Sequence, residues 1–506
     1  MKKNIFKQYG LYLVMGCMFF ASCEDALDTK IYSDMTPENF FKTEGDIKSG
    51  VTGLYVPCTT NWGYSDGGTG SWYNALFNAD ANAYLAAGFY STDEGLAYGE
   101  GNVYENFTVG PASGGALNNT YNVIRFVARC TDIINQIAKS PVSDAVKERY
   151  TAEVKTLRAY YMFALLDWFG PVNVKLDPST LSDNTILPRP DLQTYVGYIE
   201  SDLNDAVASS NLPDKYNGDN TNWGRMSKAI AYGIQMKLYL HQKNWSKVKT
   251  ATEKLMTMGF GLLPNYEDVF NNARNNEQIW AIPSNTASDN YFVTEVLPAD
   301  FKKGYNLDNK PYIRGDEKVF FSGWQVYCMR WDFYDTFQNT DKRKKTILES
   351  YSTQSGEQKT RTVMRGAIPL KFTNTQFALY GIQKEQPIIR YAEVLLSYAE
   401  AENQLNGPTI NAVNAAGLVA DRANASIPNA AKASKQAFDD YLLAERGREL
   451  YFEGQRRQDL IRHGKFVSGA VLRGKNAQDF NVLYPIPQYV IIESNKIVKQ
   501  NEGYSN

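Results

Sequence analysis

Three glutamates near the C-terminal end of the chain have the spacing that places carboxylates on one face of a helix. Glu445, Glu449 and Glu453 lie four residues apart, and side chains at this spacing are neighbours on an α-helix. Glycoside hydrolysis requires a pair of carboxyl groups, one kept protonated, that border an open cleft. Arg446 and Arg448 lie in the same segment, and their guanidinium groups would keep the carboxylates ionised. The pattern therefore favours a structural ion network, and we predict no catalytic residues.

A second pattern that could support catalysis is the sequence Gly63-Tyr64-Ser65-Asp66-Gly67, which matches the G-x-S-x-G motif of serine hydrolases. That motif requires a strand before the serine and a helix after it, whereas residues 59–62 and 67–70 are typical of a loop. The chain has only two histidines and no C-x-x-C pair, so it offers few ligands for a metal ion. We expect a non-enzymatic protein without a cofactor or a bound metal.

Aromatic side chains are the most abundant candidates for ligand binding, with 34 Tyr, 25 Phe and 8 Trp in the chain. Many lie in a stretch rich in Gly and Asn between residues 57 and 115. Flat rings pack against the apolar faces of sugars, while short amides and carboxylates bond the hydroxyl groups. The alternative is that these rings pack onto the scaffold as small cores. The predicted ligand-binding residues of this stretch are Trp62, Tyr64, Asp66, Trp72, Tyr73, Asn74, Asn78 and Asp80.

The elements that would position these residues are helical. Apolar residues recur with helical period from Tyr150 to Trp168, and Gly170-Pro171 ends that helix. Further periodic segments run from Leu192 to Val207, from Tyr391 to Leu405 and from Phe438 to Phe452.

One pair of segments resembles a tetratricopeptide hairpin. Residues 229–240 and 245–258 are separated by a short turn at Lys243-Asn244, and Gly233 would let the two helices approach each other. Between the helices lie long segments, chiefly residues 57–115 and 283–323. The sequence therefore predicts a mainly α fold of tetratricopeptide-like helix pairs, with long irregular loop insertions and little β structure.

The N-terminus has the pattern of an export signal. Lys2, Lys3 and Lys7 precede a short apolar stretch, and Phe20-Ala21-Ser22-Cys23 resembles a lipobox. We predict that residues 1–22 are removed as a lipoprotein signal peptide and that Cys23 is lipidated. Cys17 is a rival acceptor with a shorter apolar stretch before it, and a plain secretory signal is the other alternative. The segment from Glu24 to Lys30 would act as a tether.

The composition excludes some partners. The formal net charge is −2 and the pI is about 6.0, so there is no broad positive field to hold a polyanion. We therefore expect no binding to nucleic acid. The one basic run, Lys342-Arg343-Lys344-Lys345, is interpreted as a solvated helix end.

Several C-terminal motifs resemble those of the SusD/RagB family of nutrient-binding lipoproteins. The residues 390–401, Glu445 to Leu450, and Glu453-Gly454-Gln455-Arg456 through Gly464 have the order and spacing of the motifs of this family. Tyr484-Pro485-Ile486-Pro487 and residues 500–504 are similar to its closing motif, except that Glu502 stands where the family usually has Pro. In the N-terminal half, residues 157–171 also resemble the family.

The resemblance implies a second ligand-binding neighbourhood. In the family, the region around residues 324–334 often contributes to the binding face, and from it we predict Trp324 and Tyr327 as further ligand-binding residues. Trp331 and Tyr334 lie three residues apart on a predicted helix and are assigned to the core, as is Trp280. The mature chain, residues 23–506, would form one SusD-like globular unit with an N-terminal part, 23–243, and a C-terminal part, 276–506.

The resemblance also implies a function. The protein would be a cell-surface lipoprotein of the outer membrane that faces the exterior and captures an oligosaccharide. It would deliver this ligand to a SusC-like TonB-dependent transporter, above which it would move as a lid. Three alternatives stay open: a peptide-binding member of the same family, a glycoside hydrolase, and a purely structural lid without affinity of its own.

Overall fold

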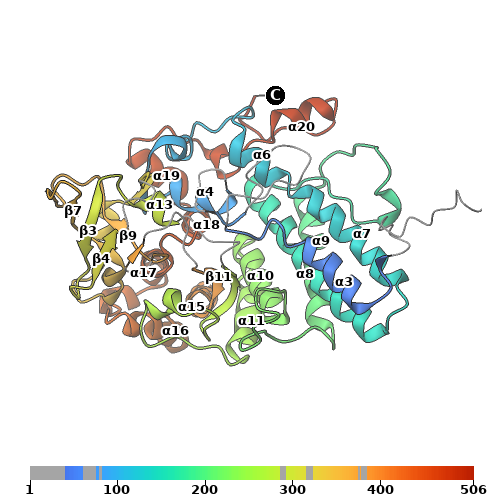
Figure 1. The fold of residues 1–506 in the computed structure, drawn as a ribbon, viewed down its shortest axis with the longest axis horizontal. Helices are drawn as coiled ribbons and strands as arrows, with labels where there is room; N and C mark the ends of the chain where they lie inside the picture. The colour runs from blue at the N-terminus through green and yellow to red at the C-terminus, as the bar shows by residue number, and fades with distance from the viewer. Residues whose placement is uncertain are drawn as a thin grey trace, which may run out of the picture.

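The computed structural model describes residues 40–60, 76–78, 83–284, 292–314, 323–373, 376–377 and 384–505. Helices dominate this part of the chain (Figure 1). The α-helices are α3 (Glu44–Gly53), α4 (Tyr84–Tyr90), α5 (Asn102–Glu105), α6 (Gly115–Tyr121), α7 (Ile124–Lys139), α8 (Asp144–Phe169), α9 (Leu192–Ala208), α10 (Lys228–His241), α11 (Trp245–Met256), α12 (Asp268–Asn271), α13 (Phe292–Val296), α14 (Trp331–Tyr334), α15 (Tyr391–Asn406), α16 (Ile410–Arg422), α17 (Lys435–Leu450), α18 (Arg456–Arg462), α19 (Phe466–Leu472) and α20 (Gln488–Glu493). Short 3₁₀ turns are η2 (Gly99–Gly101), η3 (Pro178–Thr180), η4 (Lys342–Thr346), η5 (Asn429–Lys432) and η6 (Asp479–Val482).

The strands are short, and they form small sheets. They are β1 (Gly95–Ala97), β2 (Gln278–Ile282), β3 (Phe301–Tyr305), β4 (Pro311–Arg314), β5 (Tyr327–Met329), β6 (Ile347–Leu348), β7 (Tyr351–Thr353), β8 (Gln358–Lys359), β9 (Ile368–Pro369), β10 (Gln376–Phe377) and β11 (Gln386–Arg390). One sheet has the order β10-β4-β3-β7-β8, in which only the β10 and β4 pair is parallel. Antiparallel pairs join β1 to β5, β11 to β2 and β6 to β9.

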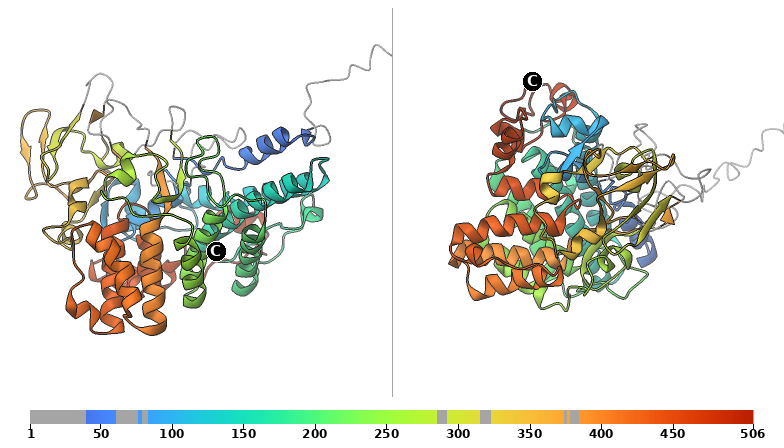
Figure 2. Two further views of the ribbon diagram at one scale, coloured as in Figure 1. Left: turned by 90° about the horizontal axis from the view of Figure 1, so that it is seen from below. Right: turned by 90° about the vertical axis from the view of Figure 1, so that its left-hand side faces the viewer.

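The helices pack against one another in chain order. The long helix α8 lies between α7 and α9, α10 contacts α9 and α11, α11 contacts α15, and α15 contacts α16 and α17. The C-terminal helices run side by side, and the five-stranded sheet lies next to them at one end of the molecule (Figures 1 and 2). This arrangement confirms the predicted mainly α fold of helix pairs with little β structure.

Local sequence explains where several helices begin and end. Helix α8 ends at Gly170, whose φ of 71° lies in the left-handed region that favours glycine. The side chain of Asp191 accepts a hydrogen bond from the backbone N–H of Thr194 at the start of α9. Asn244 caps α11 in the same way. The predicted helix boundaries around residues 170, 192 and 245 are therefore confirmed.

Gly233 has a different neighbour from the one predicted. A Cβ at this position of α10 would lie 2.7 Å from Cδ1 of Ile389, which belongs to β11. The glycine therefore makes room for a strand from the C-terminal half, not for the other helix of its own hairpin. The short β11–β2 pair, which lies against α10, occupies the space beside this glycine.

Most of the apolar core forms one continuous cluster, and a smaller cluster fills the space between α15, α16 and α17. Trp280 is 1% exposed, as predicted for a core residue, and Tyr334 is 3% exposed. Trp331 is only partly buried. Within the described residues, none of the helices combines the length and apolar character that a membrane span requires.

Candidate functional site

The three glutamates of α17 and the turn after it are buried in an ion network. Glu445 accepts hydrogen bonds from Arg343 at 2.7 Å and from Arg448 at 2.7 Å. Arg390 donates to Glu449 at 2.5 Å and to Glu453 at 2.8 Å. All three carboxylates are at most 3% exposed.

This network excludes a catalytic role for the three carboxylates. Burial by itself would raise the pKa of Glu445, but the guanidinium groups of Arg343 and Arg448 outweigh burial and hold the pKa below its usual value. The pKa values of Glu449 and Glu453 are lowered for the same reason, with Arg390 contributing to both. None of the three groups can act as a protonated acid near neutral pH, and none borders an open cleft.

Arg343 corrects the interpretation of the basic run as a solvated helix end. Its side chain is fully buried and bonds Asp341 at 2.7 Å in addition to Glu445 and Glu449. Four consecutive basic residues suggest a solvated segment, but the buried carboxylates that receive Arg343 lie about a hundred residues later in the chain. The neighbouring Lys344 and Lys345 are partly exposed.

A second buried network surrounds His463. Its Nε2 lies 3.1 Å from Glu400 and its Nδ1 lies 3.1 Å from Asp439, and Arg462 donates to Glu400 at 2.6 Å. Burial opposes the charge on His463, but the hydrogen bonds to Asp439 and Glu400 outweigh it and raise the pKa to about 9. His463 is therefore a charged structural partner, and Arg446 completes the network by contacting Asp459 at 2.9 Å.

The structure places the predicted ligand-binding residues in different environments. Asn78 is 2% exposed, and Tyr327 is fully buried with its ring stacked on Phe452 at 4.6 Å between centroids. Both residues are buried, which disagrees with their predicted role in ligand binding. The tight packing of Tyr327 leaves no ring face for a ligand. Trp324 is partly exposed. Seven predicted ligand residues lie outside the described residues, as does Cys23: Trp62, Tyr64, Asp66, Trp72, Tyr73, Asn74 and Asp80.

The described residues on either side of residues 61–75 are joined to each other. The backbone N–H of Leu76 donates to the carbonyl of Pro57 at 2.9 Å, and that of Phe77 donates to Thr59. The ring of Phe77 contacts Trp280 at 5.6 Å and Tyr160 at 5.8 Å. The described ends of the predicted binding loop are therefore joined to each other beside an aromatic core, which consists of Phe77, Tyr160 of α8 and Trp280 of β2.

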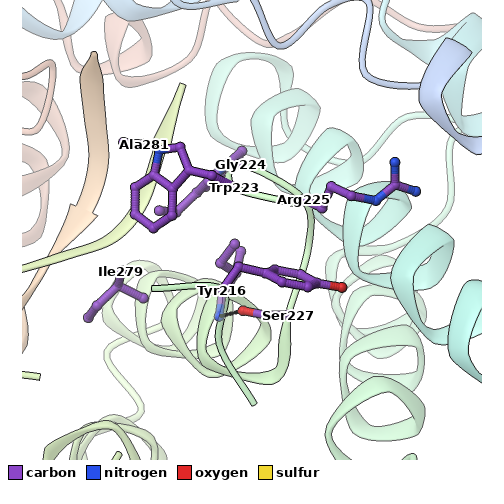
Figure 3. A pocket seen from close by; sticks show the side chains of 9 residues that line it. Tyr216, Trp223, Gly224, Arg225, Ser227, Ile279 and Ala281 are labelled. Carbon is purple, nitrogen blue, oxygen red and sulfur yellow. Dashed lines mark hydrogen bonds between the residues drawn. The ribbon is translucent and has the colours of Figure 1, made fainter. Parts of the chain in front are cut away.

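A small cavity lies beside this aromatic core, between β2 and the start of α10 (Figure 3). Tyr216, Trp223 and Ile279 line it, and Arg225 points away toward Glu153, to which it is paired at 2.9 Å. The cavity has a volume of about 10 Å³, which is enough for about one water molecule. It is too small for an oligosaccharide.

A larger hollow, of about 550 Å³, lies at the C-terminal end. It is lined by Phe480, Leu483, Asn501 and Glu502, among others. The ring of Phe480 packs edge-on against Tyr504 at 4.8 Å. Glu502, the departure from the family motif, therefore lies on the wall of this hollow. Of the predicted ligand residues that the structure describes, none lines it.

The surface around strands β1 and β5 combines exposed aromatic and polar groups. Tyr98 is 57% exposed, and its backbone N–H donates to the carbonyl of Val326 at 2.8 Å. Trp324 lies two residues before Val326, and its backbone N–H donates to Thr294 at 2.7 Å. Tyr98, Trp324, Val326 and Arg365 are called the β1–β5 surface below.

Two arginines of the neighbouring loop stack on aromatic rings. The guanidinium of Arg365 lies 4.8 Å from the ring centroid of Tyr98 and donates to the carbonyl of Ala97 at 3.1 Å. The guanidinium of Arg361 lies 4.8 Å from the ring of Trp331 and bonds both carboxylate oxygens of Asp335. Sequence reasoning missed Arg365 and did not select Tyr98, because the contact joins residues more than 260 positions apart.

Comparison with known proteins gives consistent results. Residues 352–504 match the model of the SusD family. The "SusD-like protein P25" of Formosa agariphila is 25% identical, with 98% of each chain covered. The "Starch-binding protein SusD" of Bacteroides thetaiotaomicron is 24% identical over 72% of this chain and 74% of that protein. The solved structure of "Surface glycan-binding protein A from Bacteroides thetaiotaomicron in complex with laminarihexaose" has a TM-score of 0.69 at 21% identity, covering 90% of this chain and 99% of that one.

Names that describe an activity in these comparisons describe binding, not catalysis, which agrees with the prediction of a non-enzymatic protein. The C-terminal motifs that suggested the family all fall within the matched region. The fold similarity covers 90% of this chain and therefore extends well beyond that region.

Proposed function

The chain belongs to the SusD family, and from this premise we propose that it is a cell-surface protein that binds oligosaccharides. The observation that carries the proposal is that relatives matching most of the chain include one named for binding starch, and that a structural neighbour was solved with laminarihexaose. The β1–β5 surface supports the proposal, because it presents an exposed tyrosine and a partly exposed tryptophan beside polar groups.

The β1–β5 surface has the chemistry that a sugar requires. Aromatic rings pack against the C–H faces of a pyranose, and neighbouring donors bond its hydroxyl groups. Tyr98 and Trp324 would supply the rings, and Arg365 would supply N–H donors. The predicted residues Trp62, Tyr64, Trp72 and Tyr73, with Asp66, Asn74 and Asp80, would extend this binding face.

The proposed location is the outer membrane, and the proposed partner is a transporter. Residues 1–22 would be the signal peptide, Cys23 the lipid-anchored residue of the mature chain, and residues 23–506 a single unit. The protein would lie at the outer membrane facing the exterior, deliver its ligand to a SusC-like TonB-dependent transporter and act as its lid. Family membership supports this part of the proposal.

The test is calorimetric titration of the soluble chain, beginning at Glu24, with a panel of oligosaccharides that includes laminarihexaose and starch oligomers. We expect at least one to bind, and Tyr98→Ala and Trp324→Ala each to weaken it by about 1 to 3 kcal/mol, a factor of about 5 to 150 in Kd. Trp72→Ala should also weaken binding of the same ligand, because Trp72 belongs to the predicted binding face.

Tyr305→Ala is the matched control. Tyr305 is 48% exposed and has a lysine, Lys303, stacked on its ring, but it lies on β3 in another sheet. Its removal should leave the Kd unchanged. Equal losses for Tyr305→Ala and Tyr98→Ala would argue against the β1–β5 surface.

Other outcomes would favour the alternatives. Binding to peptides and to no glycan would indicate a peptide-binding member of the family. Shortening of a glycan by the pure protein would indicate a hydrolase, although the buried ion pairs of Glu445 leave that residue no catalytic role. Unchanged nutrient uptake in cells carrying Trp72→Ala and Tyr98→Ala would indicate a structural lid.

A further inference from the structure

Arg365 has no carboxylate partner among the described residues, unlike Arg330, Arg361 and Lys475, three other cations near strand β5. Arg330 is paired with Asp332 at 2.9 Å, Arg361 with Asp335, and Lys475 with Glu105 at 2.7 Å. The Arg365 side chain is exposed, and its one hydrogen bond within the described part of the chain goes to the carbonyl of Ala97.

Glu105, which shares Ala97 as a neighbour with Arg365, does not neutralise the charge of Arg365. Glu105 also contacts Ala97, by accepting a hydrogen bond from its backbone N–H at 2.6 Å. The other oxygen of Glu105 is bound to Lys475. This carboxylate is therefore matched by a different cation, and the positive charge of Arg365 is left to solvent.

The position of Arg365 combines charge with an apolar platform. A guanidinium group has five N–H donors in a planar fork that suits a carboxylate or a sulfate. Stacking on Tyr98 holds the plane of the fork, so little side-chain entropy remains to be lost when an anion binds. The exposed remainder of the Tyr98 ring lies beside the fork, where the C–H face of a sugar could pack while its acidic group meets the guanidinium.

Resting on the proposed function, we infer that the oligosaccharide bound by this protein is anionic and that Arg365 holds a carboxylate or sulfate group of a sugar stacked beside Tyr98. A neutral glycan would leave the charge of Arg365 unmatched. An acidic sugar provides the counter-charge that the described residues lack.

The experiment compares oligosaccharides of equal length: a neutral β-glucan (laminarihexaose), an oligogalacturonate that carries carboxylates, and a sulfated galactan oligomer. We expect one of the acidic probes to bind the soluble chain more tightly than the neutral probe. The Kd for that probe should rise at least tenfold in Arg365→Gln and should increase with salt. Arg365→Lys keeps the charge but loses the fork, so it should show an intermediate loss.

Arg361→Gln is the matched control, because Arg361 is also an exposed arginine stacked on an aromatic ring, but its charge is matched by Asp335. The Kd of the Arg361→Gln variant for the same acidic probe should change less than twofold. If the neutral probe binds more tightly than both acidic probes, and Arg365→Gln leaves its Kd unchanged, the inference is overturned while the proposed function stays intact. Equal losses in Arg361→Gln and Arg365→Gln would also overturn it. No binding of any probe would overturn both.

Discussion

At the residue scale, the charged side chains of the C-terminal motifs are structural. Their carboxylates and guanidinium groups are buried together and satisfy one another, as the bonds of Arg390 to Glu277, Glu449 and Glu453 illustrate. Removing one partner would leave a buried charge unmatched, which typically costs about 3 to 5 kcal/mol. Residues with the chemistry of catalysis are therefore used here to hold distant segments together.

His463 makes stability depend on pH. Its pKa is raised from the ordinary value near 6.5 to about 9 in the folded state by the hydrogen bonds to Asp439 and Glu400, against the effect of burial. The folded state therefore binds the proton more tightly than the unfolded state. The resulting stability is fully present below about pH 6.5 and is lost as the pH rises toward about 9. We expect the difference in unfolding free energy between wild type and His463→Gln to shrink over this range by up to about 3 kcal/mol.

Urea unfolding at several pH values measures this effect. The other histidine is the control: burial lowers the pKa of His241, so His241→Gln should not alter the slope between pH 6.5 and 9. A His463→Gln variant whose stability runs parallel to that of the wild type across this range would show that His463 is not the titrating group.

At the element scale, helix α4 and the turn after α17 approach so closely that only glycine fits between them. Helix α4 rests directly on the turn after α17, where a Cβ on Gly88 would lie only 2.1 Å from the carbonyl oxygen of Gly454. Gly454 itself has a φ of 78°. This contact links the segment that leads into β1 and the β1–β5 surface to the C-terminal motifs.

Substitution of Gly88 tests that contact. Gly88→Ala should destabilise the protein by about 1 to 3 kcal/mol, because the backbone of Gly454 must move to accept a methyl group. Gly197→Ala in α9 is the matched control, since a Cβ there meets nothing within 4 Å. That control should be neutral or stabilising by up to about 1 kcal/mol, because alanine is the better helix former. Thermal or urea unfolding distinguishes the two, and equal effects would contradict the contact.

At the scale of the whole molecule, the helix pairs form a continuous scaffold, and the five-stranded sheet lies at one end of it (Figure 1). The β1–β5 surface draws its residues from both halves of the chain, with Tyr98 from one and Trp324 and Arg365 from the other. Ligand binding at this surface would therefore depend on the packing of the two halves against each other.

The proposed attachment of the chain to the membrane rests on one predicted residue. Cys23→Ala should move the protein from the membrane fraction to the soluble fraction of cells that lack the transporter, because the acyl chains on Cys23 would supply the anchor. Cys17→Ala is the control and should leave the protein in the membrane fraction. The reverse pattern would assign the anchor to Cys17.

The sequence by itself determined several of the helical elements, the boundaries near residues 170, 192 and 245, and the structural role of Glu445, Glu449 and Glu453. The helix predicted from Phe438 to Phe452 ends instead at Leu450, which places Glu453 in the turn after α17. Helical period, capping residues and side chains four residues apart are local properties, so Asn244, Gly170 and Glu445 could be interpreted without a fold. The family motifs are also short runs of neighbouring residues, and the mainly α fold that they imply is confirmed.

Only the tertiary structure decided which side chains are buried and which surface is presented. The burial of Arg343 and Tyr327, the neighbour of Gly233 and the pairing of Tyr98 with Arg365 all depend on partners far along the chain. Burial, charge neutralisation and ring stacking are properties of a site in space, and their energies appear only when distant segments are brought together. Within the described part of the chain, Arg361 is paired with Asp335, whereas Arg365, four residues later, has no carboxylate partner. This difference exists only in the folded protein.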